Sequence, residues 1–144
     1  MGFFKIPLLS FVKPTVVELT DNRVVIKIPL RRRTKNHLGS MYFGALAIGA
    51  DCAAGLIAMK FIQESDRKIS LIFKSLDAAF LKRAEGDVYF TCDQGREVSN
   101  LVTAAAASTE RVELPVDVIA TVPDKFADEP VARFTLVLSL KKKS

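Results

Sequence analysis

The sequence predicts an α+β domain in which one antiparallel β-sheet packs against a long, buried helix. Three observations indicate this fold. Alternating apolar residues, typical of half-buried strands, recur before residue 30 and after residue 70. A stretch of small and apolar residues with a single charge lies between them, and an Ala-rich segment near residue 100 favours a short second helix. At 144 residues the chain is long enough for one compact domain, residues 1–144.

The first two strands are predicted in "VVELTDNRVVIKIPLRRR", residues 16–33. Two apolar runs lie on either side of the turn residues Asp21 and Asn22. One face of the second run is apolar and is expected to face the core, through Val24, Ile26, Ile28 and Leu30.

Four further strands are predicted downstream. "SLIFKSLDAAFLKRA" (70–84) and "DVYFTCD" (87–93) lie on either side of Glu85 and Gly86 and are expected to form a hairpin. A second pair follows in "RVELPVDVIATV" (111–122) and "ARFTLVLSLKK" (132–142), each with apolar residues alternating on one face. Between the two pairs, "GREVSNLVTAAAAS" predicts the short second helix.

The long helix is predicted between Met41 and Met59, nineteen residues in which Asp51 is the only charge. This length approaches what a bilayer span needs. However, nine of the nineteen residues are Gly or Ala, and a central Asp costs roughly 2.5 to 3.5 kcal/mol on membrane insertion. Because small residues let neighbouring structure approach closely, we interpret the segment as a helix buried in a soluble domain and expect no membrane span.

Charge and cysteine content restrict the partners. The formal net charge of +5 favours anions such as phosphate-bearing cofactors, acidic lipid or nucleic acid, without choosing among them. Cys52 and Cys92 lie far apart, without CxxC or Cys/His ligand spacing. We therefore expect two buried free thiols in a reducing compartment and no metal site.

The N-terminal segment "MGFFKIPLLSFVKP" has an early Lys5, a Pro7 inside its apolar stretch and no small-residue cleavage site. These features make a poor signal peptide, so a cytoplasmic location is expected. The apolar residues of the segment are expected to pack on the domain or on a partner subunit, with a membrane-surface helix as the alternative. They are Phe3, Phe4, Ile6, Leu8, Leu9, Phe11 and Val12.

One loop and helix, "NHLGSMYFGALAIGADCAAGL" (36–56), resemble a known family. In hotdog-fold acyl-CoA thioesterases of the phenylacetate-type (PaaI-like) branch, the loop reads Asn-x-x-Gly-x-x-His-Gly-Gly and the helix that follows carries Asp or Glu. The later "FKSLDAAFLKRAEGDV" is similar to the strand-turn-strand after that helix. The matching positions here are Asn36, Gly39, Gly44 and Asp51, whereas Tyr42 and Phe43 replace the His-Gly pair.

The resemblance implies a hotdog fold, in which an antiparallel sheet wraps around one long central helix, and thioester hydrolysis. Such a reaction needs a carboxylate that activates water or attacks the carbonyl, and donors for the oxyanion. We assign the first role to Asp51, and the second to the helix N-terminal amides near Phe43 and Gly44, with Asn36 as a further catalytic residue. Asp51 lies about two turns, ~10 Å, beyond the oxyanion end on the same helix face. The resemblance implies that two subunits frame each site, so an obligate homodimer or a dimer of dimers is expected.

Each of these residues also has a structural interpretation. Asp51 could accept hydrogen bonds from a partner loop, and Asn36 could serve as a turn or capping residue. His37, the only histidine, could act with Asp51 in a hydratase, although an exposed loop histidine is the more common case. Tyr42 could donate its hydroxyl to a carbonyl or pack at the helix start.

Positive charge gathers in "RRRTK", residues 31–35. The phosphates of coenzyme A would find partners in Arg31, Arg32 and Arg33, with Lys82 and Arg83 as additions. The alternative is a solvated strand edge that charge protects from aggregation. No aromatic residues interleave with these charges, so nucleic acid is not expected as a partner.

The leading hypothesis is therefore a thioesterase that acts on acyl-CoA or another acyl thioester without a cofactor. The main alternative is a non-catalytic acyl-ligand-binding or dimerisation module in which Tyr42 and Phe43 have closed the oxyanion pocket. A hydratase that acts on enoyl thioesters is third, because it depends on His37 and Asp51 alone.

Overall fold

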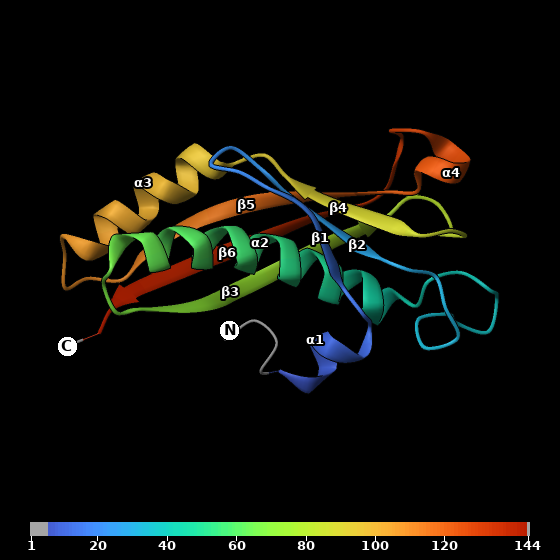
Figure 1. Cartoon of the computed structure of the whole chain (residues 1–144), viewed down its shortest axis with the longest axis horizontal. Helices are drawn as coiled ribbons and strands as arrows, with labels where there is room; N and C mark the ends of the chain where they lie inside the picture. Colours follow the sequence, from blue (N-terminus) through green and yellow to red (C-terminus); the bar gives the residue numbers. More distant parts are fainter. Residues whose placement is uncertain (1–5, 144) are drawn as a thin grey trace.

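The computed structural model describes residues 6–143. Six strands form one antiparallel sheet in the order β1-β2-β4-β5-β6-β3, with a long helix across one face (Figure 1). The strands are β1 (Thr15–Leu19), β2 (Val24–Ile28), β3 (Ile69–Phe80), β4 (Val88–Cys92), β5 (Val112–Thr121) and β6 (Pro130–Lys142). The helices are α1 (Pro7–Phe11), α2 (Phe43–Ser65), α3 (Gly95–Ala106) and α4 (Pro123–Phe126). The predicted α+β class and the hotdog arrangement are confirmed.

Helix α2 is the core helix of the domain, and α3 packs beside it (Figure 1). The small residues of α2 allow this close packing. A Cβ at Gly49 would overlap the ring of the buried Phe90, so the helix and sheet approach each other more closely than any larger residue would allow. By length and composition alone α2 could cross a bilayer, but 67% of its most apolar window is buried inside the protein.

The alternating apolar residues of β5 and β6 face the helices, as predicted. Val116, Val118, Phe134 and Leu136 are fully buried on this inner face. On the opposite face Glu113, Asp117 and Arg133 are exposed. The chain therefore buries one face of its sheet and leaves much of the other to solvent.

The prediction that residues 70–84 and 87–93 form a hairpin is wrong. β3 pairs with β6 over eleven residue pairs, whereas β4 pairs with β2 and β5 in the middle of the sheet. Segment 81–87 is thus a crossover from β3 to β4. It is held to β6 because the Val131 carbonyl accepts hydrogen bonds from the N–H groups of Leu81 and Lys82. The long apolar β6 offers far more pairing to β3 than the five-residue β4 could, so long-range pairing overrides the local turn signal.

The N-terminal segment packs only in part on the domain. Leu9 and Val12 are buried in the core, whereas Ile6, Leu8 and Phe11 are exposed. Phe3 and Phe4 lie outside the described residues. α1 lies alongside α2, away from α3 (Figure 1).

Candidate active site

Asp51 lies in the third turn of α2, at the wall of a cavity of about 420 Å³. The side chain is half-buried. Among residues 6–143 it makes no ion pair within 4.0 Å, although Lys143 borders the same cavity. The other lining residues come from the N-terminal segment, α2 and β3 and are mostly apolar: Ile6, Leu9, Gly55, Met59, Ile69, Ser70, Leu71 and Phe73.

Burial raises the pKa of the Asp51 carboxyl above 3.8, its ordinary value, because the charged form loses hydration. The same environment acts on the next residue. Burial, together with the nearby Asp51 charge, raises the pKa of the Cys52 thiol to about 12. The Cys52 thiol is thus protonated at neutral pH, which leaves the Asp51 carboxyl as the candidate proton acceptor of this pair.

Gly55, one turn after Asp51, keeps the cavity open beside the carboxylate. A Cβ built at Gly55 would lie 3.9 Å from Asp51 Oδ1 and 3.9 Å from the ring of Phe73, both ordinary van der Waals distances. A methyl group at position 55 would therefore fit beside the carboxylate and Phe73 without a clash.

The N-terminus of α2 is held by two backbone hydrogen bonds. The N–H of Met41 donates to the Ala84 carbonyl at 2.8 Å, and the N–H of Tyr42 donates to the Thr34 carbonyl at 2.7 Å. No side chain caps the helix. The first-turn amides, including those of Phe43 and Gly44, therefore have no intrahelical partner, which is the usual property of an anion-binding helix end.

Aromatic rings surround this helix end. Phe43 is 60% exposed and lies 4.8 Å from Tyr42 and 6.1 Å from Phe80, measured between ring centroids. Phe80 in turn contacts the buried Phe134. The ring of Tyr42 covers Gly44 so closely that a Cβ there would overlap it. Tyr42 and Phe43, which replace the His-Gly pair, thus form an exposed aromatic row with Phe80 at the N-terminus of α2. The contact between Phe80 and Phe134 connects this row to the core.

Asn36 closes the loop before α2. Its Oδ1 accepts hydrogen bonds from the N–H groups of Leu38 at 2.9 Å and Ser40 at 3.1 Å. Gly39 has a φ of +78°, a left-handed conformation that glycine adopts without strain. These hydrogen bonds match the alternative interpretation of Asn36 as a turn residue. His37 is exposed in the same loop.

The cavity at Asp51 does not include Asn36, Phe43 or Gly44. Within one chain, the candidate base and the candidate oxyanion donors therefore lie at different places along α2. The sequence analysis placed them about two turns apart, and the structure keeps them apart.

The three arginines line a second cavity, of about 340 Å³. Its other lining residues are Phe11, Val12, Lys13, Pro29 and Thr34. Lys82 and Arg83 are not among them, and Lys82 pairs with Glu129 at 3.1 Å. The sequence analysis missed Phe11 and Lys13, because their approach to residues 29–34 depends on the position of α1 and no spacing signals it.

The comparisons with known proteins agree with this architecture. A family model described as a domain of unknown function, DUF4442, matches residues 1–138. The chain belongs to the DUF4442 family. No curated protein matches its sequence significantly.

Several solved structures share the fold of this DUF4442 protein. A protein of unknown function from Pseudomonas aeruginosa, named a probable thioesterase, is 24% identical, with a TM-score of 0.79 over 96% of this chain and 89% of that one. A protein of unknown function from Chlorobaculum tepidum is 12% identical, with a TM-score of 0.84 over 97% and 89%. A Haemophilus influenzae thioesterase is 10% identical, with a TM-score of 0.73 over 98% and 87%. The expected resemblance to hotdog-fold thioesterases is confirmed at the level of the fold.

The DUF4442 chain presents β3 as a long edge strand. Among residues 6–143, β3 pairs only with β6, and no strand lies on its outer side. Ile72, Leu76 and Phe80 on this strand are all exposed apolar side chains. Long, apolar and unpaired edges are a ready template for pairing with another chain.

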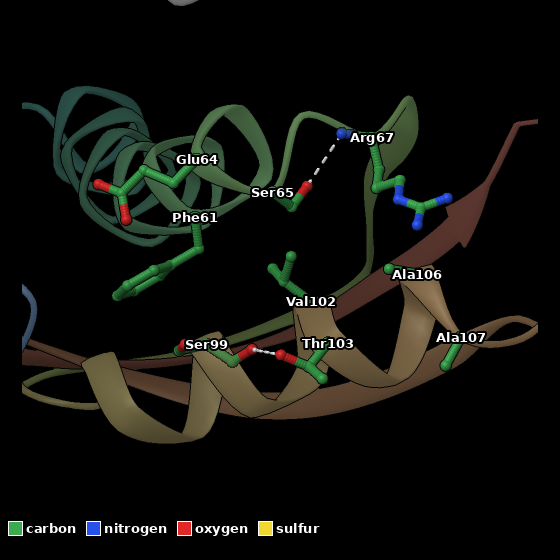
Figure 2. Close-up of a pocket in the computed structure, with 9 residues that line it drawn as sticks. All are labelled: Phe61, Glu64, Ser65, Arg67, Ser99, Val102, Thr103, Ala106 and Ala107. Carbon is green, nitrogen blue, oxygen red and sulfur yellow. Dashed lines mark hydrogen bonds between the residues drawn. The ribbon is translucent and has the colours of Figure 1, made fainter.

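A third cavity of about 380 Å³ lies between the C-terminal end of α2 and α3, and Figure 2 shows the residues that line it. Several of its polar groups already have partners. Ser65 Oγ accepts a hydrogen bond from the N–H of Arg67, Thr103 Oγ1 donates to the Ser99 carbonyl, and Glu64 pairs with Lys60. No group of three or more possible metal ligands occurs in the part of the chain that the structure describes.

Proposed function

We propose that this protein hydrolyses an acyl thioester, with acyl-CoA as the expected substrate, at sites shared between two subunits of a homodimer. The observation that carries the proposal is the half-buried Asp51 carboxylate, which borders an open, mostly apolar cavity and has a raised pKa. Perturbed carboxylates in clefts are characteristic of catalytic sites. The named thioesterases among the structures of the same fold support this choice.

In the proposed reaction the Asp51 carboxylate accepts a proton from a water molecule, and the oxygen of that water attacks the thioester carbonyl. The first-turn amides of the partner subunit's α2, near Phe43 and Gly44, donate hydrogen bonds to the oxyanion that forms. The carbon–sulfur bond then breaks, the thiolate leaves and takes up a proton, and the products are a carboxylic acid and a free thiol. Direct attack by the carboxylate, followed by hydrolysis of the anhydride, would give the same products.

The dimer is part of the proposal because one chain holds the base and the oxyanion donors apart. Pairing of two β3 strands would cover the exposed Ile72, Leu76 and Phe80. It would also bring the aromatic row at the start of one α2 toward the other subunit. Sedimentation that found a stable monomer at micromolar concentration would contradict the shared site.

Release of free thiol from a panel of acyl-CoAs is the direct test, in a cytoplasmic range of pH and salt. Hydrolysis that follows enzyme concentration, and is abolished in Asp51→Asn, is the expected result. The dimer should hydrolyse acyl-CoA at protein concentrations in the micromolar range or below.

A second candidate function is binding of an acyl ligand without turnover. The specific observation that favours it is the ring of Tyr42 over Gly44, next to Phe43, which stands where the thioesterase pattern has a glycine. Thermal stabilisation by acyl-CoA without release of thiol would support this alternative and reject hydrolysis.

A further inference from the structure

We propose that the cavity between α1 and the β2–α2 loop binds the nucleotide end of coenzyme A, the adenosine that carries 3′- and 5′-linked phosphates. The proposal rests on the proposed function for the identity of the carrier. Its further content is a site formed by two segments that are distant in the sequence, 11–13 and 29–34.

Four cationic side chains border this one cavity of about 340 Å³: Lys13, Arg31, Arg32 and Arg33. Little within the chain neutralises them. Arg31 Nη1 lies 4.0 Å from Asp87 Oδ1, and Asp87 is already engaged by Lys27 at 3.5 Å and by the N–H of Leu30 at 2.8 Å. Among residues 6–143, no carboxylate lies within 4.0 Å of the cationic groups of Arg32 and Arg33. The cavity walls are almost wholly apolar, so these side chains line it with their aliphatic stems and carry their charges at its exposed rim. The excess of positive charge at the rim matches a ligand with several phosphates.

An aromatic ring and a guanidinium lie together in the same cavity. The guanidinium carbon of Arg33 lies 5.1 Å from the centroid of the Phe11 ring, and Phe11 is half exposed. Flat aromatic and guanidinium surfaces are the groups on which proteins stack purine bases. The pair therefore provides a surface for adenine beside the cations that would bind its phosphates.

The backbone at Lys13 is unusual. Its φ is +58°, in the left-handed region that non-glycine residues seldom adopt, and Pro14 follows. Its N–H donates to the Ser10 carbonyl at 3.1 Å and closes the turn after α1. A strained conformation held by its surroundings is common where a side chain contacts a ligand. Here it places Lys13 at the cavity with the three arginines.

The cavity adjoins the candidate oxyanion site of the same subunit. Thr34 lines the cavity, and its carbonyl accepts the hydrogen bond from the N–H of Tyr42, directly before α2. A pantetheine arm that leaves the nucleotide site would need to pass only the loop before α2 to reach the first-turn amides. Lys82 and Arg83 are not part of this route, since neither lines the cavity.

An acidic membrane surface is a different partner for the same region, because Ile6, Leu8 and Phe11 are exposed next to these cations. The nucleotide is favoured because the cations border a hollow between two segments, and because Phe11 is paired with Arg33 within it. A membrane-binding surface needs neither of these features.

The test uses adenosine 3′,5′-bisphosphate as the probe, titrated into the full-length protein by calorimetry. We expect saturable binding that weakens as salt is raised. Arg32→Ser with Arg33→Ser should weaken it by more than about tenfold, and Phe11→Ala by several-fold. The matched control is Arg96→Ser with Arg133→Ser, which removes two exposed arginines outside the cavity and the same net charge.

Equal weakening by the control pair, or no binding of the bisphosphate by the unaltered protein, would overturn the proposal. A membrane partner would be indicated instead if the protein cosedimented with phosphatidylglycerol vesicles but did not bind the bisphosphate. The Arg32 and Arg33 variant should then lose the cosedimentation. All five substituted residues are exposed, so the variants are expected to fold, and unchanged melting temperatures check this.

A kinetic comparison separates this site from the proposed reaction. For acyl-CoA, the Arg32 and Arg33 variant should have a raised KM and a nearly unchanged kcat, whereas an acyl-N-acetylcysteamine thioester, which has no nucleotide, should show neither change. Bisphosphate binding without hydrolysis of either thioester would reject the thioesterase and leave the nucleotide site standing. If the unaltered protein hydrolysed both thioesters and the Arg32 and Arg33 variant lost activity equally toward both, the nucleotide site would be rejected and the thioesterase would stand.

Discussion

Two cavities of similar volume are both lined in part by the N-terminal segment 6–13, and their chemistry is opposite. Ile6 and Leu9 help to line the cavity at Asp51, whereas Phe11 and its neighbours line the cavity at the arginines. In the first, a single carboxylate is half-buried among apolar residues, and burial changes its pKa. In the second, the arginines remain exposed to solvent. A buried charge suits proton transfer, whereas exposed charges suit recognition of an anion that salt can compete away.

The largest expected effect falls on the first cavity. Asp51→Asn keeps the shape of the side chain and removes its charge, so turnover should fall by at least ~10²-fold, the scale of a lost acid–base group. Binding of adenosine 3′,5′-bisphosphate at the second cavity should not change. Turnover within a few-fold of the unaltered protein, in a well-folded dimer, would reject the catalytic assignment of Asp51.

The next prediction tests whether hydrolysis at the first cavity needs a partner subunit while bisphosphate binding at the second does not. Ile72→Lys with Leu76→Lys places two charges on the exposed side chains of β3 and should split the dimer. Thioester hydrolysis should then fall by at least about tenfold, while bisphosphate binding persists. Sedimentation measures the oligomeric state. A split dimer with full activity would show that one chain holds a complete site.

A smaller effect is expected at Gly55. Alanine should stabilise α2 by about 0.5–1 kcal/mol, because glycine is unfavourable inside a helix. The added methyl group fits at 3.9 Å from Asp51 Oδ1 and from the Phe73 ring, but it narrows the cavity. We therefore expect a raised melting temperature and a several-fold higher KM for long acyl chains relative to short ones.

Gly49→Ala is the matched control for that substitution. It adds the same methyl group to the same helix, but the new Cβ would overlap the Phe90 ring. It should lower the melting temperature and leave the chain-length preference unchanged. If Gly55→Ala destabilised the protein as much as Gly49→Ala does, the cavity beside Asp51 would not be open.

The smallest effect is the dependence of stability on pH. Burial raises the pKa of folded Asp51 above 3.8, so the folded state binds a proton more tightly than the unfolded state. The corresponding stabilisation is complete below pH 3.8 and is lost as pH rises through the folded pKa. The melting temperature of Asp51→Asn relative to the unaltered protein should therefore rise with pH across this window. A difference that stays constant from pH 3 to 8 would contradict a raised pKa.

Much of the fold could be predicted from the sequence because its signals are local. The alternation in residues 111–122 and 132–142 and the apolar run around Asp51 each specify an element and its buried face. The pairing of β3 could not be predicted in this way. The Glu85–Gly86 turn is a short-range signal, whereas the β3–β6 ladder joins residues that lie far apart in the sequence.

The candidate sites show the same division. Asp51 could be found as a lone charge in an apolar run, and the arginines as a cluster in the sequence. Phe11 and Lys13 could not be joined to Arg33, because α1 reaches residues 29–34 only through the tertiary fold. The role of Asn36 in closing its loop depends on hydrogen bonds to Leu38 and Ser40, which the motif alone does not distinguish from a catalytic contact.

The buried thiol next to Asp51 has a consequence for the fate of the acyl group. Thioesters exchange with thiolates, and a reactive cysteine beside a thioester site would capture the acyl chain and leave the protein modified. With a pKa of about 12, Cys52 is ionised in about one molecule in 10⁵ at neutral pH. The protein thus keeps the competing nucleophile protonated next to the carboxylate that we propose activates water. In the proposed reaction this favours release of a free acid over self-acylation, so that each molecule can turn over many times.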